Sequence, residues 1–340
     1  MGGVEGSQGE ILPNFQGDKW KEGGHGPRVA QALLELRRPE NRLEVLDLAL
    51  PYQEQVLSLI GIEDRDPQRN LGDYQNIGYF LIREKSENRD GRTAEAPEVV
   101  VIDPGLRDGH WIRSVLGIKK CHVIFTHFHL DHWIGYEPYQ GEAFFASPLC
   151  KMVLTQMAGA EKTGKSIFVE GRLTDYHRRP LPLRAANDAE RLLPLKEEIH
   201  EVTGRQPYRN QSLALEFFEL PYGQTEGTLY GLLETGEVKI LFASDLFVSI
   251  NNELKIEPHY AFKPKGMVIE DIVIVLRALL GKELRISADP PTLTYLKRIA
   301  QPDKIALGHG LIDFWEYREK IAHLLEELEE MLRINREHII

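Results

Sequence analysis

Short apolar segments, each bounded by polar or turn-forming residues, recur along the chain and predict β-strands. Runs of this kind that are rich in Val, Ile, Phe and Tyr are typical of strands buried in a sheet. The expected strands cover residues 76–82, 99–105, 121–126, 142–146, 212–220, 229–233, 238–243, 283–287 and 304–307. The polar stretch 83–97, between the first two strands, is expected to form a hairpin loop.

Apolar residues at helical spacing predict helices between and after these strands. The helices are expected at residues 29–36, 148–157, 268–280 and 315–337. Pro148 stands near the start of its helix, where a missing N–H has little effect. In the last helix the apolar residues form one stripe and glutamates occupy the other face, so we expect the stripe to pack against the core. The stripe consists of Ile321, Leu324, Leu325, Leu328, Met331 and Leu332.

The order of these segments predicts one large domain with an extension at its N-terminus. Residues 1–45, which begin with a Gly-rich polar stretch, are assigned to a partly flexible N-terminal extension, and residues 46–340 to the main domain. The Arg- and Pro-rich stretch 174–211 is interpreted as an insertion, with a role as a lid left open. The extension and the C-terminal helix 315–337 are both surfaces that could support a homodimer.

Composition and charge narrow the class of protein. The chain has 340 residues, of which 42% are hydrophobic and 27% charged, so it is long enough to bury a large core. A formal net charge of -11 argues against long nucleic acid as a partner and favours a small-molecule substrate. Two cysteines exclude a disulfide framework and a Cys-based zinc site. No apolar run approaches the ~20 residues needed to span a bilayer, and we expect a cytoplasmic protein without membrane contact.

The strand expected at 121–126 leads into the sequence THFHLDH, which places three imidazoles and a carboxylate within six residues. His127, His129 and Asp131 alternate by two, which puts them on one side of an extended backbone, and His132 turns to a neighbouring direction. Imidazole and carboxylate groups suit zinc, manganese and iron, and four of them can serve two adjacent ions. The structural alternative is a pair of core histidines with Asp131 as a helix cap. The spacing favours the metal site.

The longer stretch THFHLDHWIG resembles the signature of the metallo-β-lactamase fold superfamily. Three residues at the ends of expected strands resemble further positions of that family. Asp103 is similar to its supporting acid before the signature, Asp245 to its bridging carboxylate and His309 to its last histidine. The resemblance implies an α+β fold, a four-layer αββα sandwich in which two mixed β-sheets pack face to face between helices. It also implies one or two metal ions at one edge of the sandwich.

One position departs from the family pattern. Gln224 stands where the family usually carries a third histidine, so the resemblance gives one metal site built from His127, His129 and Gln224. The other site would consist of Asp131, His132 and His309, with Asp245 shared between the two. Because an amide oxygen is a weaker ligand than imidazole, we expect the first site to bind its metal less tightly. Three interpretations stay open: Gln224 binds through its oxygen, His259 or His177 replaces it, or only one metal binds.

The resemblance implies a metal-dependent hydrolase that uses a metal-bound hydroxide to cleave a small-molecule ester-type bond. Asp131 and Asp245 are the candidates for orienting the nucleophile and accepting its proton. The cofactor would be one or two divalent ions, with zinc favoured over manganese and iron. Residues 131–138, DHWIGYEP, are similar to the form found in ribonuclease Z-like enzymes and small cyclic-phosphate phosphodiesterases. A phosphodiester is therefore favoured over a thioester or a lactone.

Three other functions are alternatives to a metal-dependent hydrolase. Residues 159–166, GAEKTGKS, match the phosphate-binding loop of nucleotide hydrolases, but a helical segment precedes them and a strand follows, which is the reverse of the required context. A mononuclear or diiron oxygen-handling enzyme is an alternative within the fold, although diiron members usually carry Glu in the position of His129. The last alternative is a non-catalytic ligand-sensing member of the fold, in which Gln224 marks lost chemistry.

Overall fold

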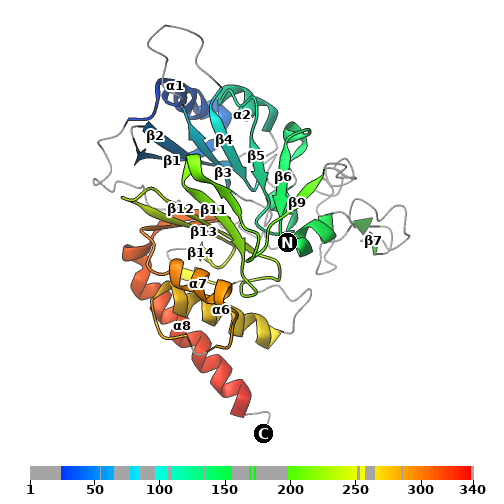
Figure 1. The fold of residues 1–340 in the computed structure, drawn as a ribbon, viewed down its shortest axis with the longest axis vertical. Helices are drawn as coiled ribbons and strands as arrows, with labels where there is room; N and C mark the ends of the chain where they lie inside the picture. The colour runs from blue at the N-terminus through cyan, green and yellow to red at the C-terminus, as the bar shows by residue number, and fades with distance from the viewer. Residues whose placement is uncertain are drawn as a thin grey trace, which may run out of the picture.

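A computed structural model of the chain describes most of the expected domain. The described residues are 24–53, 55–64, 77–84, 96–105, 109–133, 135–154, 168–169, 172–173, 198–250, 253–256, 265–284 and 286–337. The loop-like motif 159–166, the candidate ligands His177 and His259, and residues 174–197 of the expected insertion lie outside them. Two β-sheets pack face to face, with helices on their outer sides (Figure 1).

The first sheet has seven strands in the order β1-β2-β3-β4-β5-β6-β9. The strands β1 to β4 pair antiparallel, and β4, β5, β6 and β9 pair parallel. Helices α1 (Pro27–Leu36) and α2 (Gly109–Val115) cover its outer face. The strand bounds are β1 Leu43–Tyr52, β2 Gln55–Asp64, β3 Gly78–Arg83, β4 Glu98–Ile102, β5 His122–Ile124, β6 Ala143–Ala146 and β9 Ile199–Glu201.

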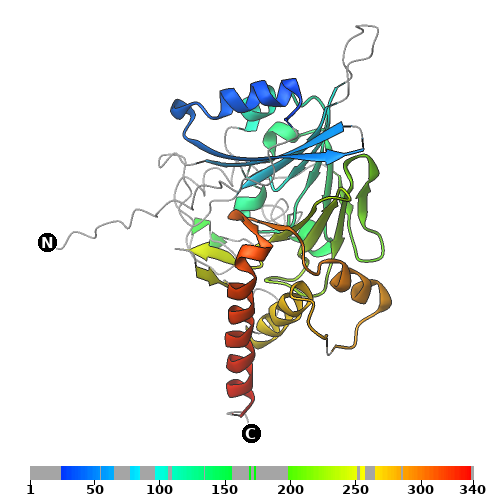
Figure 2. The same ribbon diagram turned by 90° about the vertical axis from the view of Figure 1, so that its left-hand side faces the viewer.

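The second sheet has six strands in the order β10-β11-β12-β13-β16-β17, with β13 and β16 parallel and the other pairs antiparallel. Its strands are β10 Tyr208–Asn210, β11 Leu215–Glu219, β12 Leu229–Glu234, β13 Lys239–Ser244, β16 Lys304–Leu307 and β17 Gly310–Asp313. Helices α6 (Lys265–Leu279), α7 (Pro290–Arg298) and α8 (Phe314–Glu337) lie on its outer face, and the end of α8 extends beyond the body of the molecule (Figure 2).

Short elements complete the described structure. They are α3 (Leu130–Trp133), the helical residues 148–154, the 3-10 turns Pro39–Asn41, Glu137–Tyr139 and Gln211–Leu213, and the pairs β7 (Phe168–Val169) with β8 (Arg172–Leu173) and β14 (Val248–Ile250) with β15 (Glu253–Lys255). Cys121 and Cys150 are buried free thiols. Within the described part of the chain, no helix has the length and apolar character needed to cross a bilayer.

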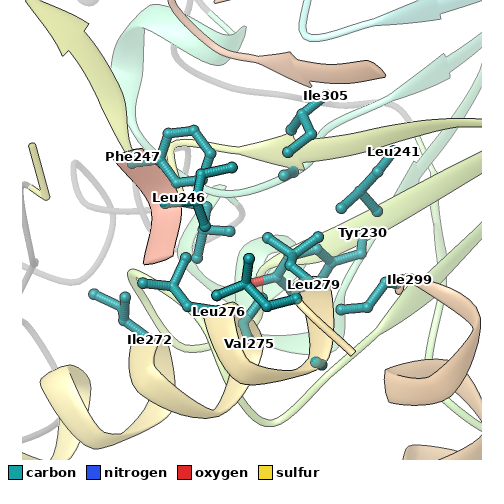
Figure 3. Close-up of a cluster of buried hydrophobic side chains, with 14 of the residues drawn as sticks. Tyr230, Leu241, Leu246, Phe247, Ile272, Val275, Leu276, Leu279, Ile299 and Ile305 are labelled. Atoms are coloured by element: carbon teal, nitrogen blue, oxygen red, sulfur yellow. The ribbon is translucent and has the colours of Figure 1, made fainter. Parts of the chain in front are cut away.

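Three apolar clusters account for the layers. One lies between the sheets and includes Leu81, Phe217 and Phe242. A second joins α1 and α2 to the outer face of the first sheet, and a third joins α6, α7 and α8 to the outer face of the second. In the third cluster, side chains of α6 meet those of β12, β13 and the segment after β13 (Figure 3). This order of layers is the four-layer αββα sandwich, which confirms the predicted fold class.

The N-terminal part of the chain is more closely integrated than expected. Strand β1 crosses the expected boundary between residues 45 and 46 and pairs with β2 over its whole length. In α1, Val29, Leu33 and Leu36 are buried in the same cluster as the outer face of the first sheet. Residues 198–211, at the end of the expected insertion, include β9 and β10, which form edges of the two sheets. Both regions therefore contribute to the sandwich.

The prediction of a strand at residues 283–287 is wrong. The described residues there, 282–284 and 286–289, have no regular secondary structure. Helix α6 ends shortly before, at a turn in which Gly281 has a φ of +67°. Leu284 and Ile286 pack against the cluster beneath α6 and α7, so their apolar character reflects a covered loop and not a sheet position.

Gly231 of β12 leaves room for the ring of Phe217, its partner on the neighbouring strand β11, which gives a stability prediction. A Cβ added at this position of β12 would lie 2.5 Å from Cζ of Phe217 in the inter-sheet cluster. Because overpacking forces side chains off their rotamers, we expect Gly231→Ala to lower the free energy of unfolding by about 1–3 kcal/mol. Urea unfolding would measure this.

The matched control is Gly266→Ala, since a Cβ at that position of α6 meets nothing within 4 Å. That change is expected to stabilise the helix by up to about 1 kcal/mol. Equal effects of the two substitutions would show that Phe217 adapts to the added methyl group.

Candidate metal centre

The ends of three strands bring the candidate ligands together. In the first sheet β5 leads into residues 126–133, which carry THFHLDH and the short helix α3. In the second sheet Asp245 directly follows β13, and His309 lies in the turn between β16 and β17. Leu229 N–H donates to the Thr126 carbonyl at 2.8 Å and so ties the two sheets together beside the histidine segment.

The Asp245 carboxylate lies at the centre of the cluster. Its Oδ2 is 3.3 Å from His127 Nε2 and 3.7 Å from His129 Nδ1. Its Oδ1 is 3.2 Å from His132 Nε2 and 3.9 Å from His309 Nε2. His127 Nε2 and His129 Nδ1 are 2.6 Å apart. Four imidazoles from separate positions of the chain therefore converge on one carboxylate.

Asp131 approaches the same nitrogen of His132 as Asp245 does, and it also lies near His309. Its Oδ2 is 3.5 Å from His132 Nε2 and 4.0 Å from His309 Nε2. Two groups of ligand atoms are compact enough to hold a cation, His127 with His132 and Asp245, and Asp131 with His132 and His309. The second group is the second site that the resemblance implied. The first group contains His127 of the expected first site, the shared Asp245, and His132; His129 Nδ1 lies beside it, 2.6 Å from His127 Nε2.

Six of the seven predicted ligands make the contacts given above, namely His127, His129, Asp131, His132, Asp245 and His309. The seventh predicted ligand is Gln224. Gln224 is buried in the loop between β11 and β12, whose end is fixed by the bond from Leu229 to Thr126. Its role as a ligand stays a prediction.

Exposure defines the open side of the cluster. The side chains of His127 and His132 are fully buried, whereas 29% of the His309 side chain is exposed. Asp131 and Asp245 are nearly buried, at 8% and 6%. His309 is therefore the most exposed side chain of the cluster, followed by His129 at 12%.

Asp103 and Ser244 orient the two buried histidines. Nδ1 of His132 is 2.9 Å from Asp103 Oδ2, and Nδ1 of His127 is 2.8 Å from Ser244 Oγ. Asp103 Oδ1 accepts from the Thr126 N–H at 2.7 Å. When Nδ1 of a histidine is bonded in this way, the Nε2 lone pair is directed at the metal position.

Contacts from the first sheet hold His309 in place. The Ile77 N–H donates to the Gly308 carbonyl at 2.7 Å. The Tyr79 hydroxyl is 2.8 Å from the carbonyl oxygens of both Leu307 and Gly310. The turn that carries His309 is thus clamped on both sides. Sequence reasoning gave no role to Tyr79, Thr126 or Ser244. Thr126 opens the THFHLDH stretch, but nothing in the sequence links it to Ser244.

The pKa values reflect a crowded set of charges. Burial raises the pKa of Asp131; His132 opposes this increase and Asp245 adds to it. Burial also acts to raise the pKa of Asp245, but His132 and His127 outweigh it and hold that pKa well below its usual range. For His132, burial lowers the pKa but Asp245, Asp103 and Asp131 together raise it well above the usual value. A bound cation would displace the His132 proton, so metal affinity should rise with pH.

The donor set fits a divalent metal ion. Oδ1 of Asp245 is buried and accepts no hydrogen bond within the described residues. A buried carboxylate oxygen without a partner is costly unless a cation or a water fills the position. Neutral imidazole nitrogens and carboxylate oxygens are the ligands that zinc, manganese and iron take in proteins.

Comparisons with known proteins agree with this geometry. The family model described as the metallo-β-lactamase superfamily matches residues 98–295, more than half of the chain. The chain belongs to the metallo-β-lactamase superfamily. It is a metallo-hydrolase by class, and the family resemblance seen in the sequence is confirmed. A comparison with curated protein sequences gives no match.

Solved structures resemble the chain at low sequence identity. FIM-1 from Pseudomonas aeruginosa, in its mono-zinc form, is 15% identical with a TM-score of 0.45, covering 84% of this chain and 97% of that one. A metallo-β-lactamase from Erythrobacter litoralis is 13% identical with a TM-score of 0.43, covering 84% and 100%. One from Pontibacter korlensis is 14% identical with a TM-score of 0.42, covering 84% and 99%.

Proposed function

We propose that the chain is a binuclear metal-dependent hydrolase that cleaves a small phosphodiester. The observation that carries the proposal is the convergence of four imidazoles and two carboxylates on one partly open cluster around Asp245. One ion would be held on the side of His127 and His129 and the other between Asp131 and His309, with Asp245 shared. Divalent ions held there supply Lewis acidity and lower the pKa of bound water.

The position of each carboxylate in the cluster suggests its role in the reaction. Asp245 lies at the buried centre, where Oδ2 is near His127, Oδ1 is near His309 and both oxygens are 3.2 Å from His132 Nε2, so it suits a bridging ligand. Asp131 lies beside His309, on the exposed side from which substrate approaches. Asp131 is therefore placed to orient the attacking water and accept its proton. Asp103 holds His132 in the tautomer that leaves Nε2 free.

Charge and sequence support a small phosphodiester as the substrate. A net charge of -11 argues against long nucleic acid, whereas a small anion can approach bound cations. The stretch 131–138, DHWIGYEP, resembles the form found in phosphodiesterases of this fold. Hydrolysis of bis(p-nitrophenyl) phosphate, compared with that of a thioester and a lactone by the same zinc-loaded preparation, tests this choice. Faster turnover of the thioester or lactone would move the assignment to that substrate class.

Metal content of the wild type and of Gln224→His tests the binuclear centre. We expect nearly two zinc or manganese ions per wild-type chain, with one of them bound more weakly, because an amide is a weaker ligand than imidazole. Gln224→His is expected to tighten the weaker ion by roughly 10-fold, on the scale of changes around metal sites. Elemental analysis and chelator competition on untagged protein measure both quantities.

Other results of the same measurement would point elsewhere. One iron per chain would favour a mononuclear oxygen-handling enzyme, and two irons a diiron one. No metal after reconstitution would contradict the enzyme and favour a ligand-sensing protein. An unchanged affinity in Gln224→His would show that Gln224 is not a ligand.

A further inference from the structure

Two residues next to the cluster have a backbone conformation that is unusual for side chains with a Cβ. Asp103 has a φ of +50° and Ser244 a φ of +52°, both in the left-handed region. Asp103 directly follows the buried strand β4 of the first sheet, and Ser244 is the last residue of the buried strand β13 of the second. Such conformations persist where the surrounding structure requires them, and they gather at functional sites.

A continuous chain of buried hydrogen bonds joins these two residues. Ser244 Oγ is 2.8 Å from His127 Nδ1 and 2.9 Å from Thr126 Oγ1. Thr126 Oγ1 is in turn 2.6 Å from Asp103 Oδ2. All four side chains are buried. The same Asp103 oxygen lies 2.9 Å from Nδ1 of His132.

The chemistry of the groups fixes the direction of this chain. An ionised carboxylate only accepts hydrogen bonds, so the Thr126 hydroxyl donates to Asp103. The Thr126 oxygen then accepts from the Ser244 hydroxyl, and the Ser244 oxygen accepts from the Nδ1–H of His127. His127 is left as the tautomer whose Nε2 lone pair would bind a cation held beside Asp245, whose Oδ2 lies 3.3 Å away. When a cation displaces the second proton of His132, the direct bond to Asp103 leaves His132 in the same state.

We propose that Ser244 is a positioning residue that, with Thr126, extends the orienting effect of Asp103 to His127. One carboxylate thereby presets both buried histidines as metal ligands, one directly and one through two hydroxyls. The inference rests on the metal centre proposed above and is independent of the substrate.

The backbone around Ser244 explains why the hydroxyl is placed there. The Ser244 carbonyl accepts from the Gly308 N–H at 2.9 Å, next to His309, and the pairing of β13 with β16 shifts register between Phe242 and Ser244. A glycine would adopt this left-handed conformation without steric cost. Glycine has no hydroxyl, however, and the bonds to His127 and Thr126 would be lost. The serine therefore combines a disfavoured backbone with the shorter of two hydroxyl contacts to His127 Nδ1, 2.8 Å against 3.3 Å from Thr126 Oγ1.

Zinc affinity and stability of Ser244→Gly and Ser244→Ala test the proposal. Both variants lack the hydroxyl, so both should bind the zinc served by His127 about 10- to 100-fold more weakly, as seen when groups that orient metal ligands are removed. Ser244→Gly also relieves the backbone strain, so without metal it should unfold at a higher temperature than Ser244→Ala. Chelator competition with Zn²⁺ and thermal unfolding measure the two effects.

Ser58→Ala is the matched control. Ser58 is also a buried serine whose Oγ lies 2.9 Å from a histidine Nδ1, that of His25, but it belongs to β2 and not to the cluster. It should leave zinc affinity unchanged. Nitrogen-15 shifts of the imidazoles in metal-free protein provide a second readout, because zinc on Nε2 would itself hold the proton on Nδ1. Without zinc, neutral His127 should carry its proton on Nδ1 in the wild type and show a mixed or altered signal in Ser244→Gly.

The outcomes separate this inference from the proposed function. Wild-type zinc affinity in both Ser244 variants would overturn the positioning role while the metal centre stands. A wild type that binds no zinc would overturn the metal centre and this role together. A wild type that binds zinc but hydrolyses no ester would contradict only the activity.

Discussion

Asp245→Ala is expected to reduce hydrolysis by about a thousand-fold or more and to lower the metal content below that of the wild type. The Asp245 carboxylate lies within 4 Å of His127, His129, His132 and His309, so this one change removes a contact to four candidate ligands. If the metal ions and their ligands stabilise the transition state by about 4 kcal/mol less in the variant, the rate of hydrolysis falls about a thousand-fold. Steady-state kinetics and elemental analysis of the same preparation measure both.

Two further variants isolate the cause. Asp245→Asn keeps the shape of the side chain but removes its charge, and it should lose most of the same activity. Asp289→Ala also removes a carboxylate, but one that caps α7 through the Thr292 N–H at 3.1 Å. It should cost about 1 kcal/mol of stability and leave the metal content unchanged. Wild-type metal content in Asp245→Ala would contradict a central ligand role.

The local sequence was sufficient to predict part of the centre. His127, His129, Asp131 and His132 are within six residues, so their spacing alone indicated a metal site, and the structure brings them together. Asp245 and His309 lie more than a hundred residues further along the chain. Only the resemblance to a family linked them to the histidines, because the pairing depends on how β13 and β16 meet β5 across two sheets.

The supporting contacts could not be predicted in this way. Tyr79 reaches the carbonyl of Leu307 and Thr126 reaches Ser244 across long separations in sequence, and neither pair carries a local pattern. The hairpin of β1 and β2 was missed for a related reason. Strand β1 is partly covered on both faces, by α1 on one and by the inter-sheet core on the other. Its apolar and polar residues therefore do not alternate as they would in a strand with one face exposed to solvent.

Phe247→Ala is expected to lower the free energy of unfolding by about 3–5 kcal/mol, the range for removing a large aromatic side chain from a core. Phe247 is fully buried in the same apolar cluster as Leu246 and the α6 residues Ile272 and Leu276 (Figure 3). Urea unfolding in the presence of a chelator measures this without a contribution from bound metal. The control Met267→Ala, at an exposed position of α6, should change stability by less than about 0.5 kcal/mol.

The same substitution links the core to the metal centre. Asp245 directly precedes Leu246, whose N–H donates to the Ala243 carbonyl at 3.1 Å, so the packing of Leu246 and Phe247 fixes the turn that presents the carboxylate. Phe247→Ala should therefore also weaken zinc binding, although Phe247 is no ligand. Phe247→Ala could instead be destabilised as expected and still bind zinc as tightly as the wild type. That result would show that the end of β13 and its hydrogen bonds hold Asp245 without the help of Phe247. If both quantities fall, the core beneath α6 is part of what positions the Asp245 carboxylate.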